Sequence, residues 1–369
     1  MKLKKAAALT LTSIMAIGLA ACGGSASSSA ASDTTADSGA ASASESAAQA
    51  APSSGDAVEI ENSYTWNVAM NVAESTLNYK FYDVFKKDIE ERSGGKITLN
   101  LYPNGQLGGD AEQLQGLMDG SVDFSTTITS GMTSTIPAYG VWDLPNAFSN
   151  VEALRAVEEN PDLIKALNEA SAEKHIHLMG VADAGFRELT SNKEIKSVAD
   201  LSGLKIRVID NPYHQAYWTA LGAATTTMDF NEVYSSLQQK VIDAEENPYM
   251  NITANKFYEV QPYIVETNHL GHIMVFTMNQ DLYDSLPDNV KTLIDECAAN
   301  ALEETRAAAD EAIEGYKQTI VDYGCTIVEL DEAVLTEMQE LASPVYDQVR
   351  SDLGDEMVDT FLAAADAAK

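Results

Sequence analysis

The sequence predicts a two-domain α/β protein, and three features of the chain lead to that expectation. Between residues 64 and 128, three segments with the apolar pattern of a strand alternate with two segments of helical period. That order is typical of a mostly parallel sheet covered by helices. Residues 185–248 contain a second strand-and-helix unit, and residues 287–323 keep one helical spacing over a length that is unusual within one globular domain.

The elements of the first region end at recognisable stop signals. Glycine follows each of the two helical runs, and glycine readily adopts the left-handed conformation that ends a helix. We expect strands at residues 64–69, 96–102 and 122–128, and helices at 79–91 and 111–119. Residues 142–148 look like a loop, and Pro161 breaks the helix expected at 151–172.

The strand at 204–208 carries the first candidate functional residue. Its apolar side chains alternate with Lys205 and Arg207, the pattern of a strand with one buried face. Arg207 therefore points away from the apolar face. A guanidinium on a rigid strand beside a groove suits a carboxylate, because its planar fork can meet both oxygens. The alternative is an arginine that bridges a neighbouring acid, as many surface arginines do.

A helix and a polar loop follow this strand. Asp229 and Glu232 stand three apart, like a capping box, and one apolar helical face follows. The residues of that face are Val233, Leu237 and Val241. Residues 243–248 form the expected loop, since Pro248 disfavours helix in the residue before it.

The remainder of the chain returns to the first region and ends in helices. Strands are expected at 177–181, 264–267 and 273–278, and helices at 335–341 and 357–364. The helix at 287–323 stops at Gly324. Cys297 lies on its apolar stripe, which is typical of a core thiol, and spacing alone leaves open whether Cys297 pairs with Cys325.

The N-terminal segment predicts export and tethering. Residues 1–21 combine a basic start with a short apolar run, the architecture of a secretory signal peptide. Small residues directly before Cys22 resemble a lipoprotein lipobox, which implies cleavage there and lipidation of Cys22; the alternative is an ordinary signal peptide. Residues 22–60 are rich in Ser and Ala, so we expect a disordered tether. We assign residues 61–184 and 273–312 to domain I and residues 185–272 and 313–369 to domain II, with a ligand cleft between them.

The charge of the chain excludes some partners. A formal net charge of −33 argues against nucleic acid and against electrostatic adhesion to an anionic membrane. It does not exclude an anionic ligand, because one desolvated arginine outweighs distant, screened surface charges.

Several ordered segments resemble a known family. They are LYP at 101–103, QLG at 106–108, GFRELTSN at 185–192, GLKIRV at 203–208, MDFNEVY at 228–234, ENP at 246–248 and KFYEVQ at 256–261. Together they resemble the extracytoplasmic solute-binding proteins of the tripartite ATP-independent periplasmic (TRAP) transporters, the DctP type. The resemblance implies a periplasmic-binding-protein-like fold of type II character, with a long helix that spans both domains.

The resemblance also implies roles for five residues. Arg207 would pair with the substrate carboxylate, Arg187 would be a second arginine at the ligand, and the amide of Asn247 would reach the ligand. Phe230 would wall the site, and Asn71 would be a cleft position of the N-terminal domain. The alternatives are an ion pair for Arg187, a turn role for Asn247 and core filling for Phe230; Trp218 and Tyr234 also fit either cleft or core.

Two departures from the family pattern bear on the ligand. Glu245 stands where the family commonly has glutamine, and it would repel a second acid group of the ligand if it faced the cleft. Residues 126–130 lack the glutamate that sialic-acid-binding members place near there, which argues against sialic acid. A monocarboxylate or a hydroxylated acid is thus at least as well matched as a dicarboxylate.

Signals for catalysis or metal binding are poor. The chain has no G-x-S-x-G, P-loop, G-x-G-x-x-G or C-x-x-C motif. The pairs His175/His177 and His269/His272 lack the third ligand that a metal site needs. We therefore expect no enzyme activity, no cofactor and no metal.

These observations predict a monomeric, lipid-anchored, extracytoplasmic solute-binding protein. It would capture a small organic acid anion and deliver it to the membrane subunits of a TRAP-type permease driven by an ion gradient. The alternatives are a protein that presents its ligand to a membrane sensor kinase, the binding protein of an ATP-driven importer, or a secreted lyase or hydrolase.

Overall fold

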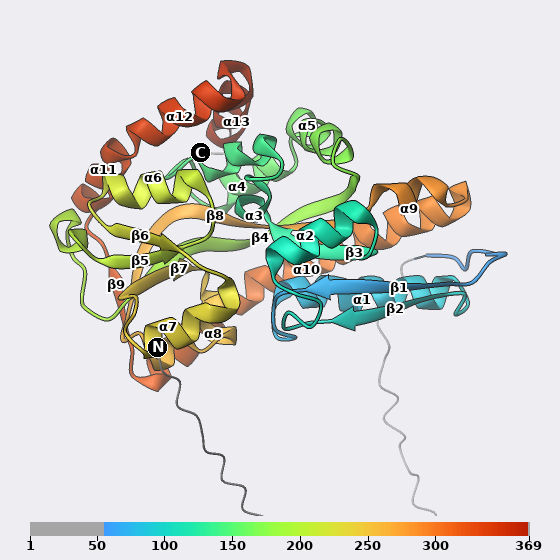
Figure 1. The fold of residues 1–369 in the computed structure, drawn as a ribbon, viewed down its shortest axis with the longest axis horizontal. Coiled ribbons are helices and arrows are strands. Elements are labelled where there is room, and N and C mark those ends of the chain that lie inside the picture. Colours follow the sequence, from blue (N-terminus) through green and yellow to red (C-terminus); the bar gives the residue numbers. More distant parts are fainter. Residues whose placement is uncertain (1–54, 368–369) are drawn as a thin grey trace, which may run out of the picture. The chain divides into compact units, whose positions relative to one another are not determined.

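A mixed sheet organises the part of the chain that the computed structural model describes, residues 55–367 (Figure 1). Within these residues it has nine strands, in the order β2-β1-β3-β8-β4-β7-β5-β6, with β9 paired to β8. The expected signal peptide, Cys22 and most of the expected tether lie outside the described residues. Between residues 55 and 367, no helix is both long enough and apolar enough to span a membrane.

The first half of the sheet forms largely where the sequence predicts it. Its strands are β1 (Tyr64–Met70), β2 (Ile97–Tyr102) and β3 (Phe124–Ile128), and its helices are α1 (Leu77–Arg92) and α2 (Asp110–Asp119). β1 pairs in parallel with β2 and β3. Thr76 caps α1 by accepting a hydrogen bond from the backbone of Tyr79, and Gly120 ends α2 at φ 78°.

The second half repeats the parallel pattern with shorter elements. Its strands are β5 (Lys205–Val208), β6 (Ala224–Thr227) and β7 (Ala244–Asn247). Its helices are α6 (Pro212–Ala220), α7 (Val233–Gln238), α8 (Tyr249–Ala254) and the 3-10 turns η2 (Val198–Leu201), η3 (Phe230–Glu232) and η4 (Phe257–Glu259). β5 lies between β6 and β7 and is parallel to both.

Two predictions for this half are wrong. The expected loop at 243–248 contains strand β7, whose four residues are all buried; residues from another strand donate hydrogen bonds to its two carboxylates. The expected capping box forms only in part: Asp229 caps η3 by accepting from the backbone N–H of Asn231, but the Glu232 side chain makes no return bond within residues 55–367. The following helix ends at Gln238, and Val241, expected on the apolar face, is 58% exposed.

Two long antiparallel strands join the halves. β4 (Ile176–Ser191) and β8 (Tyr263–Asn279) pair along most of their length, β8 also pairs with β3, and β4 also pairs with β7. The sequence predicts shorter, separate strands here because bulges interrupt the alternation. One bulge lies between Asp183 and Phe186, where Gly185 adopts φ 78°. The sheet is parallel within each half and antiparallel between them, so the expectation of a mostly parallel sheet holds only within the halves.

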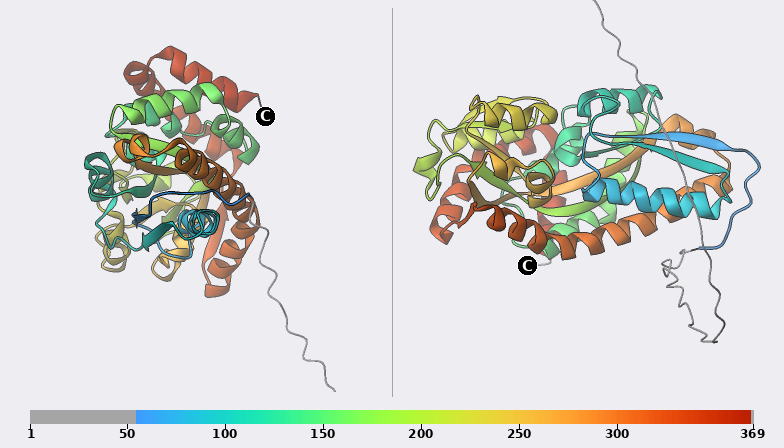
Figure 2. Two further views of the ribbon diagram at one scale, coloured as in Figure 1. Left: turned by 90° about the vertical axis from the view of Figure 1, so that its right-hand side faces the viewer. Right: turned by 90° about the horizontal axis from the view of Figure 1, so that it is seen from below.

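The long helix α10 (Asp288–Tyr323) contacts both halves, as predicted (Figure 2). Its N-terminal residues Leu293 and Cys297 are buried in the core between the helix, α1 and the first three strands. Near its C-terminus, Ile320 packs into a second core under α7 and α8. Gly324 ends the helix at φ 105°.

The remaining helices cover the opposite face of the sheet. They are α3 (Thr129–Met132), η1 (Pro137–Asp143), α4 (Val151–Glu158), α5 (Pro161–Ala172), α11 (Glu332–Leu341), α12 (Ser343–Leu353) and α13 (Asp355–Asp366). Two further elements lie elsewhere: helix α9 (Gln280–Ser285), which follows β8, and the short strand β9 (Thr326–Glu329). The break between α4 and α5 is confirmed, whereas part of the expected loop at 142–148 belongs to η1. Trp142, Trp218 and Phe361 are fully buried in this third core. Cys297 is buried as expected, and both Cys297 and Cys325 are free thiols.

Candidate functional site

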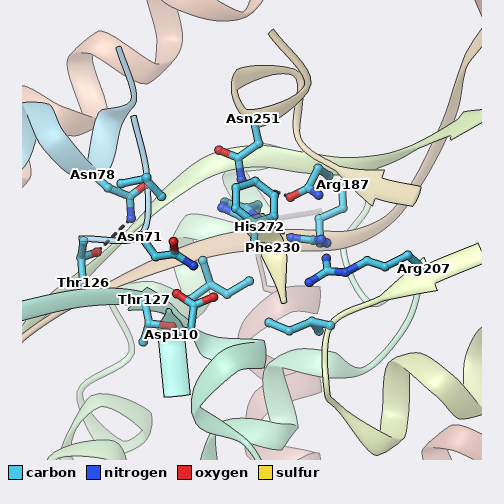
Figure 3. Close-up of a pocket in the computed structure, with 14 residues that line it drawn as sticks. Asn71, Asn78, Asp110, Thr126, Thr127, Arg187, Arg207, Phe230, Asn251 and His272 are labelled. Atoms are coloured by element: carbon cyan, nitrogen blue, oxygen red, sulfur yellow. Dashed lines mark hydrogen bonds between the residues drawn. The ribbon is translucent and has the colours of Figure 1, made fainter. Parts of the chain in front are cut away.

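A pocket lies where the two halves of the sheet meet, and all five residues singled out in the sequence line it (Figure 3). Its lining encloses about 490 Å³ of space, open solvent at the mouth included. The first half contributes Asn71, Val72, Asn78, Asp110, Thr126, Thr127 and Ile128, and the second half contributes Arg207, Ile209, Phe230, Asn247 and Asn251. Arg187 and His272 come from the long strands β4 and β8.

Arg207 is a buried cation without an acidic partner. Its side chain is 3% exposed, and no carboxylate between residues 55 and 367 lies within ion-pair distance of it. Nε and Nη2 donate to the backbone oxygen of Met228, at 3.1 and 2.8 Å. A guanidinium has five N–H groups, so three remain without a described partner, including both on Nη1. Burial lowers the pKa of Arg207, although the more distant Glu246 and Glu245 oppose that shift.

Phe230 holds this guanidinium from one side. The carbon Cζ of Arg207 lies 5.9 Å from the centre of the Phe230 ring, within the range of a cation–π contact. Phe230 also packs edge-on against Phe257, with ring centres 5.9 Å apart. The ring therefore connects the arginine to the core beneath α7 and α8.

Arg187, in contrast, is already paired. Nη2 donates to the backbone oxygen of Glu246 and to its Oε1 at 2.9 Å, and Nε donates to Oε2. Nη1 donates to Nδ1 of His272 at 2.7 Å. Four of its five N–H groups are thus used, and one remains on Nη1. The ion pair weighed in the sequence exists, but it is buried rather than at the surface, and the same arginine lines the pocket.

A buried network holds this pair in place. Burial would raise the pKa of Glu246, but Arg187, a hydrogen bond with His269 and the nearby ring of His214 hold it well below its ordinary range. The pKa of His272 lies well below its ordinary value because the ring is buried and faces Arg187. His272 is therefore neutral and can accept from Arg187.

The amide of Asn247 belongs to a chain of side chains behind the pocket. Its Nδ2 donates to Oε2 of Glu245 at 2.6 Å, and its Oδ1 accepts from Nδ2 of Asn251 at 3.1 Å. Glu245 also accepts from the hydroxyl of Thr190 at 2.9 Å. Glu245 is fully buried and does not line the pocket, so it does not face a ligand directly.

The opposite wall carries neutral polar groups and one acid. Both polar atoms of the buried Asn71 amide lack a hydrogen bond of good geometry within the described part of the chain. Asn78 donates to Thr126 at 2.9 Å and has an unpartnered Oδ1. Burial raises the pKa of Asp110 to about 6, while Asn71 and the charge of Arg207 act to lower it. Figure 3 shows these side chains across the pocket from the two arginines.

Sequence reasoning missed Asp110, Asn78 and Asn251, and it considered His272 only as a possible metal ligand. Each belongs to a stretch that looks ordinary by itself, and only Asp110, at a helix start, carries a local signal. Of the aromatic candidates, Trp218 is buried in a core, and neither Trp218 nor Tyr234 lines the pocket. The pair His269/His272 belongs to the network around Glu246, and residues 55–367 contain no cluster of three or more potential metal ligands.

The pocket is suited to holding an anion that also carries hydrogen-bonding groups. Arg207 can meet a carboxylate with two parallel hydrogen bonds, and the side chain of Arg187 lies on the same side of the pocket. The unpartnered amide of Asn71 supplies a donor and an acceptor on the other side. Buried polar groups without partners are rare in folded proteins, so their concentration here indicates a ligand site.

Comparisons with known proteins identify the family of this chain. The family model described as bacterial extracellular solute-binding protein, family 7 (DctP) matches residues 68–352. The C4-dicarboxylate-binding periplasmic protein DctP of Rhodobacter capsulatus is 30% identical over 297 residues, 79% of this chain and 88% of that protein.

Solved structures of such proteins share the fold. The sugar acid binding protein DctPAm of Advenella mimigardefordensis, in complex with galactonate, aligns with a TM-score of 0.81 and 28% identity over 84% of this chain and 99% of that one. A TRAP periplasmic solute-binding protein of Shewanella oneidensis with bound succinate aligns with a TM-score of 0.79 and 28% identity, over 82% and 99% of the two chains. The predicted fold class, two-domain α/β with a long spanning helix, is confirmed.

Proposed function

Because the chain belongs to the bacterial extracellular solute-binding proteins of family 7, we propose that its pocket captures one hydroxylated organic acid anion for uptake by a TRAP-type permease. Arg207 is the anchor for the carboxylate, Phe230 orients it, and Arg187 and Asn247 lie beside it. Asn71 and its neighbours on the opposite wall receive the hydroxyl-bearing end. The role is binding and release, without chemical change of the ligand.

The observation that carries this proposal is the unpaired guanidinium of Arg207. A buried charge is costly unless it is paired, and here no carboxylate of the described chain pairs with it. An arriving carboxylate supplies the missing partner at the three open N–H groups. A neutral analogue leaves them unmatched, which costs about 2–5 kcal/mol, the scale for losing one partner of a buried charge pair.

The opposite wall favours hydroxyl groups over a second carboxylate. Asp110 is an anion above about pH 6, and it would repel the far carboxylate of a dicarboxylate. The oxygens of Asp110 can instead accept hydrogen bonds from hydroxyls of the ligand, and the amide of Asn71 can both accept from them and donate to them. The galactonate bound by the Advenella mimigardefordensis protein is an acid of this kind.

A C4-dicarboxylate is the second candidate, and a specific observation favours it. The Shewanella oneidensis structure holds succinate at 28% identity, and the Rhodobacter capsulatus relative is named for such acids. In this chain, however, both cations of the pocket lining lie on one side, and Arg187 is already neutralised by Glu246.

We propose the position of the protein in the cell from its N-terminal segment. The small residues before Cys22 support cleavage and lipidation there, with residues 22–60 as a tether, so that the binding domains lie close to a permease. We also propose that domain I comprises residues 61–184 and 273–312 and that domain II comprises 185–272 and 313–369. Loss of membrane association in a Cys22→Ala variant of the exported protein tests the anchor.

A calorimetric titration of the tether-free protein tests the ligand class. The panel contains galactonate, gulonate, lactate and succinate, each with its amide. We expect a hydroxylated acid to bind most tightly and its amide at least about 30-fold more weakly. Equal affinity for an acid and its amide contradicts the role of Arg207, and a preference for succinate decides for the second candidate.

A further inference from the structure

We infer that Glu245, which does not line the pocket, makes the pocket select ligands with a hydroxyl group. It does so through a relay, a row of hydrogen bonds from Glu245 through Asn247 to Asn251, in which Glu245 fixes how the two side-chain amides are oriented. The inference rests on the proposed function, because it concerns the ligand that the same pocket captures. It assigns a specificity role to a residue behind the binding surface. It also identifies Asn251 as the group that reads the ligand hydroxyl.

The relay consists of three buried side chains in hydrogen-bond contact. Glu245, Asn247 and Asn251 are 0%, 3% and 6% exposed. Nδ2 of Asn247 donates to Oε2 of Glu245 at 2.6 Å, and Nδ2 of Asn251 donates to Oδ1 of Asn247 at 3.1 Å. The last atom of the relay, Oδ1 of Asn251, is buried and has no partner within residues 55–367, and Asn251 lines the pocket.

The direction of the relay follows from the chemistry of its first member. An ionised carboxylate can only accept, so the Asn247 amide must turn its N–H group toward Glu245 and its oxygen toward Asn251. Asn251 must then turn its N–H group toward Asn247, which leaves its own oxygen without a partner in the described part of the chain. An amide alone has no such preference, because its two ends are nearly equal in shape and the hydrogen-bond partners decide its orientation.

The consequence is a buried acceptor at the ligand. A hydroxyl of the ligand can donate to Oδ1 of Asn251. A methylene group at the same place leaves this oxygen without a partner, and a second carboxylate cannot donate to it and is repelled by it. Leaving a buried acceptor unsatisfied lowers affinity by roughly 5- to 150-fold. The pocket thus recognises the hydroxyl through Asn251 and the carboxylate through Arg207, at two separate places.

The test is the Glu245→Gln variant, which has nearly the same shape but accepts and donates. Matched pairs of acids are titrated calorimetrically into wild type and variant: lactate and propionate, malate and succinate, galactonate and 2-deoxygalactonate. The buffer is held at about pH 8, where Glu245 is largely ionised although burial raises its pKa to about 7. Glu188→Gln is the matched control, because Glu188 is a buried residue opposite Asn247 on β4 whose carboxyl group accepts from the backbone of Asn268 and not from the side chains of the relay.

We expect wild type and Glu188→Gln to favour the hydroxylated member of the best-bound pair by at least about tenfold, and Glu245→Gln to lose about tenfold of that preference. If Glu245→Gln does not fold, Asn251→Leu must reduce the same ratio. An unchanged ratio in Glu245→Gln, or in Asn251→Leu, overturns the relay while leaving carboxylate capture intact. If no acid binds to wild type, the proposed function itself is wrong, and the inference fails with it.

Discussion

Replacing Arg207 and Arg187 in turn by methionine separates a binding arginine from a structural one. Both side chains are buried in one pocket, but Arg187 neutralises Glu246 and Arg207 neutralises no described carboxylate. In the ligand-free protein, Arg207→Met removes an uncompensated charge and two bonds to a backbone oxygen. These effects oppose each other, so we expect the free energy of unfolding to change by no more than about 1 kcal/mol.

Arg187→Met should behave in the opposite way. It leaves the Glu246 carboxylate buried without its principal cation, and breaking such a pair costs about 3–5 kcal/mol. Urea unfolding of the two ligand-free variants measures this difference directly. His214 and His269 still face Glu246, so partial compensation keeps the expected loss nearer to about 3 kcal/mol.

Arg207→Met, the variant expected to change stability little, is expected to lose much of its affinity for the ligand. With the acid that the panel identifies, Arg207→Met should weaken binding by roughly 30- to 5,000-fold, the equivalent of about 2–5 kcal/mol. Arg207→Lys keeps the charge but not the planar fork, and it should recover only part of the affinity. The reasoning is refuted if Arg207→Met unfolds as readily as Arg187→Met and still binds the acid like wild type.

Three further predictions concern the pocket wall and the buried acids. Asp110→Asn should strengthen succinate binding about tenfold relative to galactonate in calorimetric titration, because the repulsion of a far carboxylate disappears; an unchanged ratio shows that Asp110 does not face that end. Asn71→Leu should leave the ligand-free protein at least as stable, since both polar atoms of the amide lack partners, and should weaken acid binding about tenfold; a large loss of stability in thermal unfolding would contradict the first part. Burial raises the pKa of Glu158 from 4.5 to about 8, so its contribution to stability is full below pH 4.5 and is lost as the pH rises through 8. Glu158→Gln should remove on the order of 5 kcal/mol of that decline in urea unfolding, and parallel pH profiles of wild type and variant would exclude this role.

The sequence by itself determined most of the helices and the short strands of the first half. Thr76, Gly120 and Gly324 act through local backbone chemistry, and the apolar periodicity of the long helix needs no distant partner to be read. Local order likewise placed Arg207 on a strand with its side chain off the apolar face. Ordered sequence segments carried the resemblance from which the five pocket residues were named.

Tertiary structure decided what the polar residues do. The sequence predicts a loop at residues 243–248 because Pro248 disfavours helix before it. Residues 244–247 instead form a central strand, because Thr190, Arg187 and Asn251 supply partners for its polar side chains from other segments. The difference between Arg207 and Arg187 is likewise invisible in the sequence, where both are arginines on strands. It arises because Glu246 lies within reach of one guanidinium and not the other, and pairing of charges depends on distances that only the folded chain sets.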